Sequence, residues 1–276
     1  MDNEHPYQFL SLAVRETHSE IIRHVENPSV FDTVTIPDKP TGSSPTMRID
    51  LMADTTLCQG ISHRMGDVHY VSEERPWKRE NLEGYQRVVV ADPLDGTQLL
   101  AMGLTHWAVS AALLNMREHI VEACATVDAH GVLFASELKS QYHTCTAPTL
   151  VQLRSQKQLR GARLALDGRK PEKILRTQAL LGQHFSDPAW ILGLGGAPAI
   201  LRVISGHLDA TFGRCRGYDF APAAITAKAC GASMTDWNGN PIDAFEVLAD
   251  PSQKCSWIVA CSTQLAADLQ EILHDK

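Results

Sequence analysis

The spacing of hydrophobic and polar residues predicts two helices at the start of the chain. Residues 6–26 place their apolar side chains on one helical face, which is the pattern of an amphipathic helix. Residues 51–65 show the same spacing and predict a second helix, with Asp54 near its first turn. The segment 28–48 between them is rich in Pro, Ser, Thr and Gly, so we expect a loop or hairpin there.

Short apolar runs of strand length follow these helices. The runs are VHYV at 68–71 and the segments 87–91, 107–114, 120–127 and 131–138. Adjacent strands after two helices are typical of an α+β arrangement.

The second part of the chain alternates between the two periodicities. Strands are predicted at 163–166, 190–193 and 208–212, and helices at 171–184, 198–205, 220–230 and 263–273. The composition turns polar near 146–160, so we expect two parts, 1–148 and 149–276, the first carrying the main functional site.

Composition and charge exclude several classes of protein. The chain is 44% hydrophobic and 21% charged, as in an ordinary globular protein, and holds no apolar run long enough to cross a membrane. The net charge of −7, with no dense run of Lys and Arg, does not support a nucleic-acid partner or binding to an anionic membrane surface. Seven scattered Cys without CxxC pairs argue against a disulfide framework or a zinc site. No secretory signal is visible, so we expect a cytoplasmic protein.

The stretch RVVVADPLDGTQLL at 87–100 ends a predicted strand in two carboxylates, Asp92 and Asp95. The spacing of oxygen-bearing side chains does not fit an EF-hand calcium loop. It does not fit a haloacid-dehalogenase motif either, because the two acids of that motif are two residues apart, whereas Asp92 and Asp95 are three residues apart. A metal cluster fits, because two carboxylates and the Leu94 carbonyl can bind hard cations. Gly96 and Thr97 would then begin a helix whose N–H groups bind phosphate. A capped helix start with solvated acids is the open alternative.

Further motifs give the chain a resemblance to a known family. They are MADTTLCQGI, VSEE, DPLDGT, GGAPAILRVISGHLDATF, YDFAPAAITAKACGA and WIVACSTQLAADLQEIL, which together cover most of the length. With them the chain resembles the inositol monophosphatase superfamily, which includes fructose-1,6-bisphosphatases and 3′-phosphoadenosine phosphatases. The resemblance implies a layered α/β/α/β/α fold, a lithium-sensitive phosphatase with two or three Mg²⁺ (Mn²⁺ as the alternative ion), and a homodimer.

The resemblance also implies the roles of individual residues. The implied metal ligands are Glu73, Asp92, the Leu94 carbonyl, Asp95 and Asp219. Thr97 would orient the attacking water together with Glu73, and Asp54 would hydrogen-bond Thr97. The implied substrate contacts are Asp95, Gly96, Thr97, Gly196, Ala197 and Asp219. The expected reaction is hydrolysis of a small phosphomonoester, such as an inositol monophosphate or sugar phosphate, by a metal-activated water without a covalent phosphoenzyme.

One segment departs from the family pattern and bears on the substrate. Gly213 stands where inositol monophosphatases carry an acid that meets a substrate hydroxyl, and Arg214 and Arg216 follow it. Guanidinium groups near the pocket would suit a second phosphate or carboxylate, which makes a nucleotide or sugar bisphosphatase the alternative function. Two surface arginines in a loop are the alternative interpretation. A catalytically silent binding protein on the same fold is the second alternative function.

Overall fold

The first part of the chain builds a six-stranded sheet with two helices. The computed structural model describes residues 6–36, 45–75, 84–139, 142–145, 151–167, 175, 179, 181–182 and 190–274. The helices are α1 (Pro6–His24) and α2 (Arg48–Met65). The strands, in chain order, are β3 (His69–Ser72), β4 (Arg87–Asp95), β5 (Ala108–Asn115), β6 (Ile120–Asp128), β7 (Leu133–Lys139) and β8 (Tyr142–Cys145). They pair in this same order, β3 parallel to β4 and the others antiparallel.

The segment between the two helices fits the expected hairpin. It holds a short helix, η1 (Pro28–Phe31), and the paired strands β1 (Thr33–Val34) and β2 (Thr46–Met47). Residues 37–44 of this segment lie outside the described part of the chain.

The second part builds a five-stranded sheet in the order β10-β9-β11-β13-β12. Its strands are β9 (Arg163–Asp167), β10 (Trp190–Leu192), β11 (Ala210–Arg216), β12 (Ser233–Thr235) and β13 (Lys254–Ala260). Its helices are α5 (Gly196–Ile204), α6 (Gly217–Ala229), α7 (Ala244–Ala249) and α8 (Thr263–Leu273). Most of the helix expected at 171–184 lies outside the described residues.

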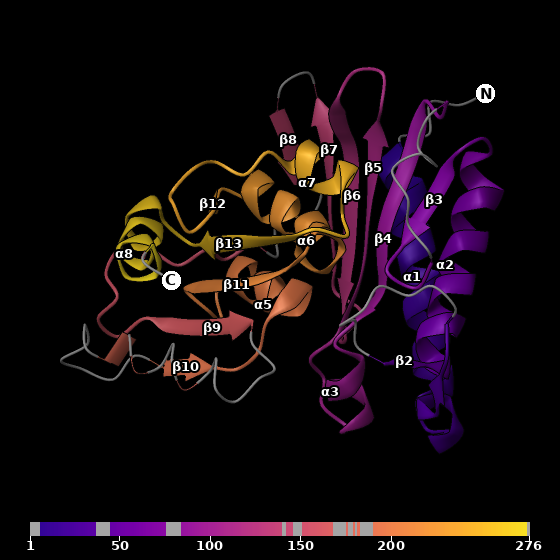
Figure 1. Cartoon of the computed structure of the whole chain (residues 1–276), viewed down its shortest axis with the longest axis horizontal. Helices are drawn as coiled ribbons and strands as arrows, with labels where there is room; N and C mark the ends of the chain where they lie inside the picture. Colours follow the sequence, from indigo (N-terminus) through magenta and orange to yellow (C-terminus); the bar gives the residue numbers. More distant parts are fainter. Residues whose placement is uncertain are drawn as a thin grey trace.

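Five layers follow from these elements, as Figure 1 shows. Helices α1 and α2 cover one face of the first sheet, and α5 and α6 cover the other. The second sheet packs on the far side of α5 and α6, and α8 covers its outer face. The predicted α/β/α/β/α order is therefore confirmed. None of the described helices combines the length and the apolar character that crossing a bilayer requires.

Strand β4 is buried on both faces because it lies between two helical layers. Val89 and Ala91 pack toward α1 and α2, while Val88 and Val90 pack toward α5 and α6. This explains why the sequence of the strand is a continuous run of apolar residues rather than an alternation of apolar and polar residues.

Three boundaries differ from the sequence prediction in ways that affect the site. Helix α2 begins at Arg48, so Asp50 rather than Asp54 lies in its first turn. Strand β4 continues through the acidic residues to Asp95. Strand β11 extends to Arg216 because it pairs along its whole length with β13, a contact that local sequence does not reveal.

Candidate active site

Three carboxylates from distant parts of the chain meet at one place. Glu73 follows β3, Asp92 lies near the end of β4, and Asp219 lies in the first turn of α6. One carboxylate oxygen of each lies within 4.8 Å of the others. Burial raises the pKa of Asp92 well above its usual range, and the neighbouring Asp95, Glu73 and Asp219 raise it further. We call Glu73, Asp92 and Asp219 the acid cluster.

A β-bulge gives the end of β4 its shape. Asp92 pairs with Ser110 and Asp95 with Ala108, so β4 carries one residue more than β5 between the two pairs. Pro93 is tolerated there, since a bulge needs no regular ladder bond. Gly96 follows with φ 94°, and a methyl group on it would lie 2.5 Å from the His106 carbonyl oxygen, so the turn requires glycine.

The side chain of Asp95, the last residue of β4, lies against the start of α5, beside the acid cluster. Its Oδ2 accepts a hydrogen bond of 2.7 Å from the backbone N–H of Ala197. Gly196, with φ 72°, approaches so closely that a methyl group there would lie 2.0 Å from the same oxygen. The helix N-terminus stabilises the negative charge of this carboxylate. The structure therefore brings the predicted residues Asp95, Gly196 and Ala197 together.

Thr97 begins the short helix α3 (Thr97–Ala101) and bonds to Asp50, not to Asp54. Its hydroxyl lies 2.6 Å from Asp50 Oδ1 and 3.0 Å from the Leu94 carbonyl oxygen. Burial raises the pKa of Asp50 to about 7, although its hydrogen bonds to Thr97 and to the Met47 N–H act in the opposite direction. The predicted contact of Asp54 with Thr97 is wrong, because α2 begins three residues earlier than expected.

Asp54 is instead the acceptor of a buried network at the end of β3. Tyr70 Oη, Ser72 Oγ and Arg75 Nε lie 3.1, 2.5 and 2.8 Å from its carboxylate oxygens. Glu73 stands between two of these donors in the chain. Asp54 therefore fixes the strand end that carries Glu73, without touching Thr97.

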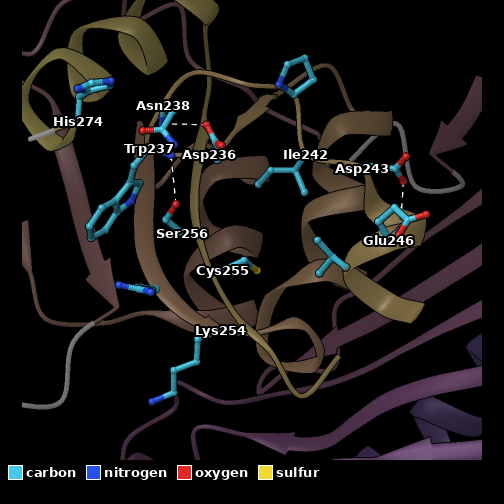
Figure 2. A pocket seen from close by; sticks show the side chains of 13 residues that line it. Asp236, Trp237, Asn238, Ile242, Asp243, Glu246, Lys254, Cys255, Ser256 and His274 are labelled. Carbon is cyan, nitrogen blue, oxygen red and sulfur yellow. Dashed lines mark hydrogen bonds between the residues drawn. The ribbon is translucent and has the colours of Figure 1, made fainter. Parts of the chain in front are cut away.

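The two arginines of β11 lie in different places. Arg216 is 8% exposed, and its Nη1 lies 3.6 Å from Glu73 Oε1. Its backbone N–H donates to Asp219 Oδ2 at 3.2 Å. Arg214 is exposed and lines a separate hollow of about 520 Å³, together with Trp237, Asp243 and Lys254 (Figure 2).

No acid-cluster residue is among those that line this hollow. The prediction that Arg214 contacts the substrate finds no support in this placement, because Arg214 lines the separate hollow. The interpretation of both arginines as surface loop residues is wrong, because both belong to β11 and Arg216 is buried.

The residues of the site fit divalent metal ions. The oxygen atoms of Glu73, Asp92 and Asp219 converge, and carboxylate oxygens are the ligands that Mg²⁺ prefers. Burial and the negative charges of Asp95, Glu73 and Asp219 raise the pKa of Asp92, and a cation bound here would favour its ionised form. Asp95 and the Leu94 carbonyl adjoin this group in the chain and can add oxygen ligands.

Asp50 is the residue that sequence reasoning missed. A signal for it was present, because Asp50 and Asp54 are four residues apart and share a helix face. Asp50 also lies three residues after Met47, which is the spacing of a capping residue, and its Oδ2 accepts a hydrogen bond of 2.7 Å from the backbone N–H of Met47. Correct placement of the helix start would have brought Asp50 into the site.

Comparison with known proteins identifies the relatives of this arrangement. The family model described as "Inositol monophosphatase family" matches residues 2–273. The 3′(2′),5′-bisphosphate nucleotidase CysQ of Salmonella typhimurium is 28% identical over 209 residues, covering 72% of this chain and 79% of that protein. CysQ of Escherichia coli strain K12 is 28% identical over 210 residues, covering 73% and 80%.

Solved structures share the fold at lower identity. The extragenic suppressor protein suhB from Bartonella henselae superposes with a TM-score of 0.76 at 17% identity, covering 96% of this chain and 97% of that one. An IMPase from Thermotoga maritima gives 0.75 at 17% identity, covering 97% and 96%. An IMPase/NADP phosphatase complexed with Mg²⁺ and phosphate gives 0.73 at 14% identity, covering 98% and 95%.

Proposed function

Because the chain belongs to the inositol monophosphatase family, we propose that it is a magnesium-dependent phosphomonoesterase acting on a small phosphorylated metabolite, such as an inositol monophosphate or sugar phosphate. The observation that carries this proposal is the convergence of Glu73, Asp92 and Asp219 within 4.8 Å. Such a group of carboxylates is costly to bury unless cations or protons neutralise it.

The metal ligands would be the acid cluster, Asp95 and the Leu94 carbonyl. These residues offer enough oxygen atoms for two or three Mg²⁺, with Mn²⁺ as the alternative ion. Bound Mg²⁺ would polarise the phosphoryl group, favour ionisation of the attacking water and neutralise the leaving oxygen.

Thr97 and Asp50 would position the attacking water. The Thr97 hydroxyl has one proton and two acceptors within reach, Asp50 Oδ1 and the Leu94 carbonyl. When Thr97 uses this proton to donate a hydrogen bond to ionised Asp50, the Thr97 oxygen can accept a hydrogen bond from water. Glu73 can accept a second one, which would hold the water in a single orientation.

The phosphoryl group would lie between the metal ligands and the backbone of Gly96 and Thr97. Gly196 and Ala197 would form the wall opposite, where the N-terminus of α5 already holds Asp95. Arg216 would offset part of the negative charge beside Glu73. Its position next to the acid cluster favours a role in holding Glu73.

The test is phosphate release by the purified protein after removal of metals with a chelator. We expect no activity on p-nitrophenyl phosphate without metal, recovery with Mg²⁺, and weak activity in Asp95→Asn. A panel of phosphate esters would then identify the preferred substrate. Absence of Mg²⁺-dependent hydrolysis across the panel would contradict the proposal and favour the catalytically silent alternative.

A nucleotide bisphosphatase is the second candidate function, because relatives named 3′(2′),5′-bisphosphate nucleotidase match almost three quarters of the chain. Adenosine 3′,5′-bisphosphate would be preferred over adenosine 5′-monophosphate if this candidate were correct. We further propose that lithium inhibits the enzyme, which the phosphate-release assay would test. We also propose that the protein forms a homodimer, which sedimentation of the purified protein would test.

A further inference from the structure

We propose that the hollow at Arg214 is a second ligand site, which binds a small zwitterion with a carboxylate at one end and an ammonium group at the other. Its volume of about 520 Å³ lies within the usual range of small-molecule sites. Its lining includes no residue of the acid cluster. The inference concerns binding alone, so it does not depend on the proposed phosphatase function.

One side of the hollow presents hydrogen-bond donors from two neighbouring strands. Arg214 on β11 lies directly opposite Ser256 on β13, and Lys254 lies two residues from Ser256. Because side chains alternate along a strand, these three side chains project from the same face of the sheet. The guanidinium and ammonium groups carry positive charge and only donate hydrogen bonds. Together they complement an anionic group such as a carboxylate.

These positive charges are not neutralised by acids of the protein. Within the ranges that the structure describes, neither Arg214 nor Lys254 forms an ion pair or a side-chain hydrogen bond, and both are exposed. Ser256 Oγ accepts a hydrogen bond of 3.4 Å from the backbone N–H of Trp237, so its own O–H can donate to a ligand. All three side chains therefore have donors available on this side of the hollow.

The other side of the hollow carries two exposed acids. Figure 2 shows Asp243 and Glu246 away from Lys254, with Ile242 between them. Asp243 Oδ1 accepts hydrogen bonds from the backbone N–H groups of Phe245 and Glu246. The acids therefore do not pair with the basic side chains across the hollow, and together they complement an ammonium group.

The third acid of the lining, Asp236, is engaged by its own turn. Its oxygen atoms accept hydrogen bonds of 2.8, 2.8 and 3.0 Å from the backbone N–H groups of Asn238 and Asn240 and from the Asn240 side chain. These three donors offset part of its charge. Asp236 therefore opposes an anion at Arg214 less than a carboxylate without such donors would.

The distribution of charge selects the class of ligand. A molecule with two anionic groups would be repelled by the acidic side, and one with two ammonium groups by the basic side. The apolar side chains of Pro241, Ile242 and Val247 also line the hollow, so a short hydrocarbon chain between the two charged groups would contact them. An amino acid whose charged groups stand at opposite ends of such a chain fits all three features.

The experiment is a ligand-observed NMR titration of the full chain at fixed low ionic strength, which limits the screening of exposed charges. The probes are 4-aminobutanoate and 6-aminohexanoate, each compared with the two analogues of equal chain length that keep only the carboxylate or only the ammonium group. We expect at least one zwitterion to bind roughly threefold to tenfold more tightly than both of its analogues.

Single substitutions assign each charge to its side of the hollow. Arg214→Gln and Lys254→Gln should each weaken binding of the zwitterion by roughly threefold to tenfold and leave the ammonium analogue unchanged. Glu246→Gln should weaken the zwitterion and leave the carboxylate analogue unchanged. Arg15→Gln removes an exposed cation from α1 and should change none of these affinities. Circular dichroism should show the same fold in all four variants, because the replaced side chains are exposed.

Four outcomes would overturn the inference. They are no binding of either zwitterion, equal affinity for a zwitterion and its analogues, unchanged binding in all three hollow variants, and loss of binding in Asp95→Asn but not in Arg214→Gln, which would place the ligand in the candidate active site. None of these outcomes bears on Mg²⁺-dependent phosphate release, so the proposed function stands or falls separately.

Discussion

Binding of Mg²⁺ should release protons from the acid cluster, and this release can be counted. Burial raises the pKa of the Asp92 carboxyl group well above its usual range, and the neighbouring Asp95, Glu73 and Asp219 raise it further, so its protonated form is favoured over that of an exposed carboxyl when no cation is present. A carboxylate must lose that proton to bind a metal ion. Titration with Mg²⁺ should therefore transfer protons from the protein to the buffer.

The geometry of the cluster gives the magnitude. Two ionised carboxylates 4.8 Å apart repel each other by about 3.5 kcal/mol at an effective dielectric constant of about 20. Three such pairs would cost about 10 kcal/mol, as much as the whole stability of a typical domain. This repulsion disfavours full ionisation of the cluster without a cation, although Arg216 offsets part of the charge of Glu73.

Asp50 should contribute a smaller share. Its pKa of about 7 leaves it about half protonated near pH 7, and a cation next to Glu73 would favour its ionised form. We expect a measurable release of protons at pH 7, of which Asp50 would supply up to about half a proton, and a smaller release at higher pH.

The assay is isothermal titration calorimetry with Mg²⁺ in two buffers of different ionisation enthalpy. The difference between the observed heats gives the number of protons released. Asp50→Asn is the informative variant, because it should still bind Mg²⁺ but release about half a proton less near pH 7. A wild type that binds Mg²⁺ with the same heat in both buffers from about pH 6 to 8 would refute the reasoning.

Four further predictions concern single residues. Thr97→Ala should lower kcat by roughly tenfold to a thousandfold with nearly unchanged Mg²⁺ affinity, which steady-state kinetics and calorimetry would check, and Thr97→Ser should restore part of the rate. Asp95→Asn should lower kcat at least about a hundredfold while circular dichroism shows an intact fold. Asp54→Asn should lower the free energy of unfolding by about 1–3 kcal/mol in urea titrations, because it weakens three contacts at once. The metal-free protein should lose stability as the pH rises from about 4 to about 7, because the pKa of Asp50 is raised in the folded state, and melting temperatures in a chelator should show a flatter profile for Asp50→Asn.

The sequence was sufficient for features that local spacing controls. Helix α1 and strand β6 lie where their hydrophobic periodicities predict them, because each buries one continuous face or run. The carboxylates at the acidic end of β4 and a family resemblance predict a metal site there. The layered order came from that resemblance, since periodicity alone does not say which sheet face a helix covers.

The features of the site that the sequence did not predict depend on contacts between distant segments of the chain. The choice between Asp50 and Asp54 depended on where α2 begins, and β2 and the Asp50 capping contact fix that start. The placement of Arg214 and Arg216 on a strand rather than in a loop depends on the pairing of β11 with β13.

The origin of the acid cluster also has a consequence for how the protein is made. Glu73 and Asp92 leave the ribosome early, whereas Asp219 lies on α6 in the last quarter of the chain. At usual rates of translation, the segment from Asp92 to Asp219 takes on the order of 6–25 s to synthesise. During that time the nascent chain has only part of the proposed metal ligands. Under the proposed function, complete metal binding would follow synthesis of the second part, and a truncated product that ends before α6 would lack the complete cluster, however well its first sheet had folded.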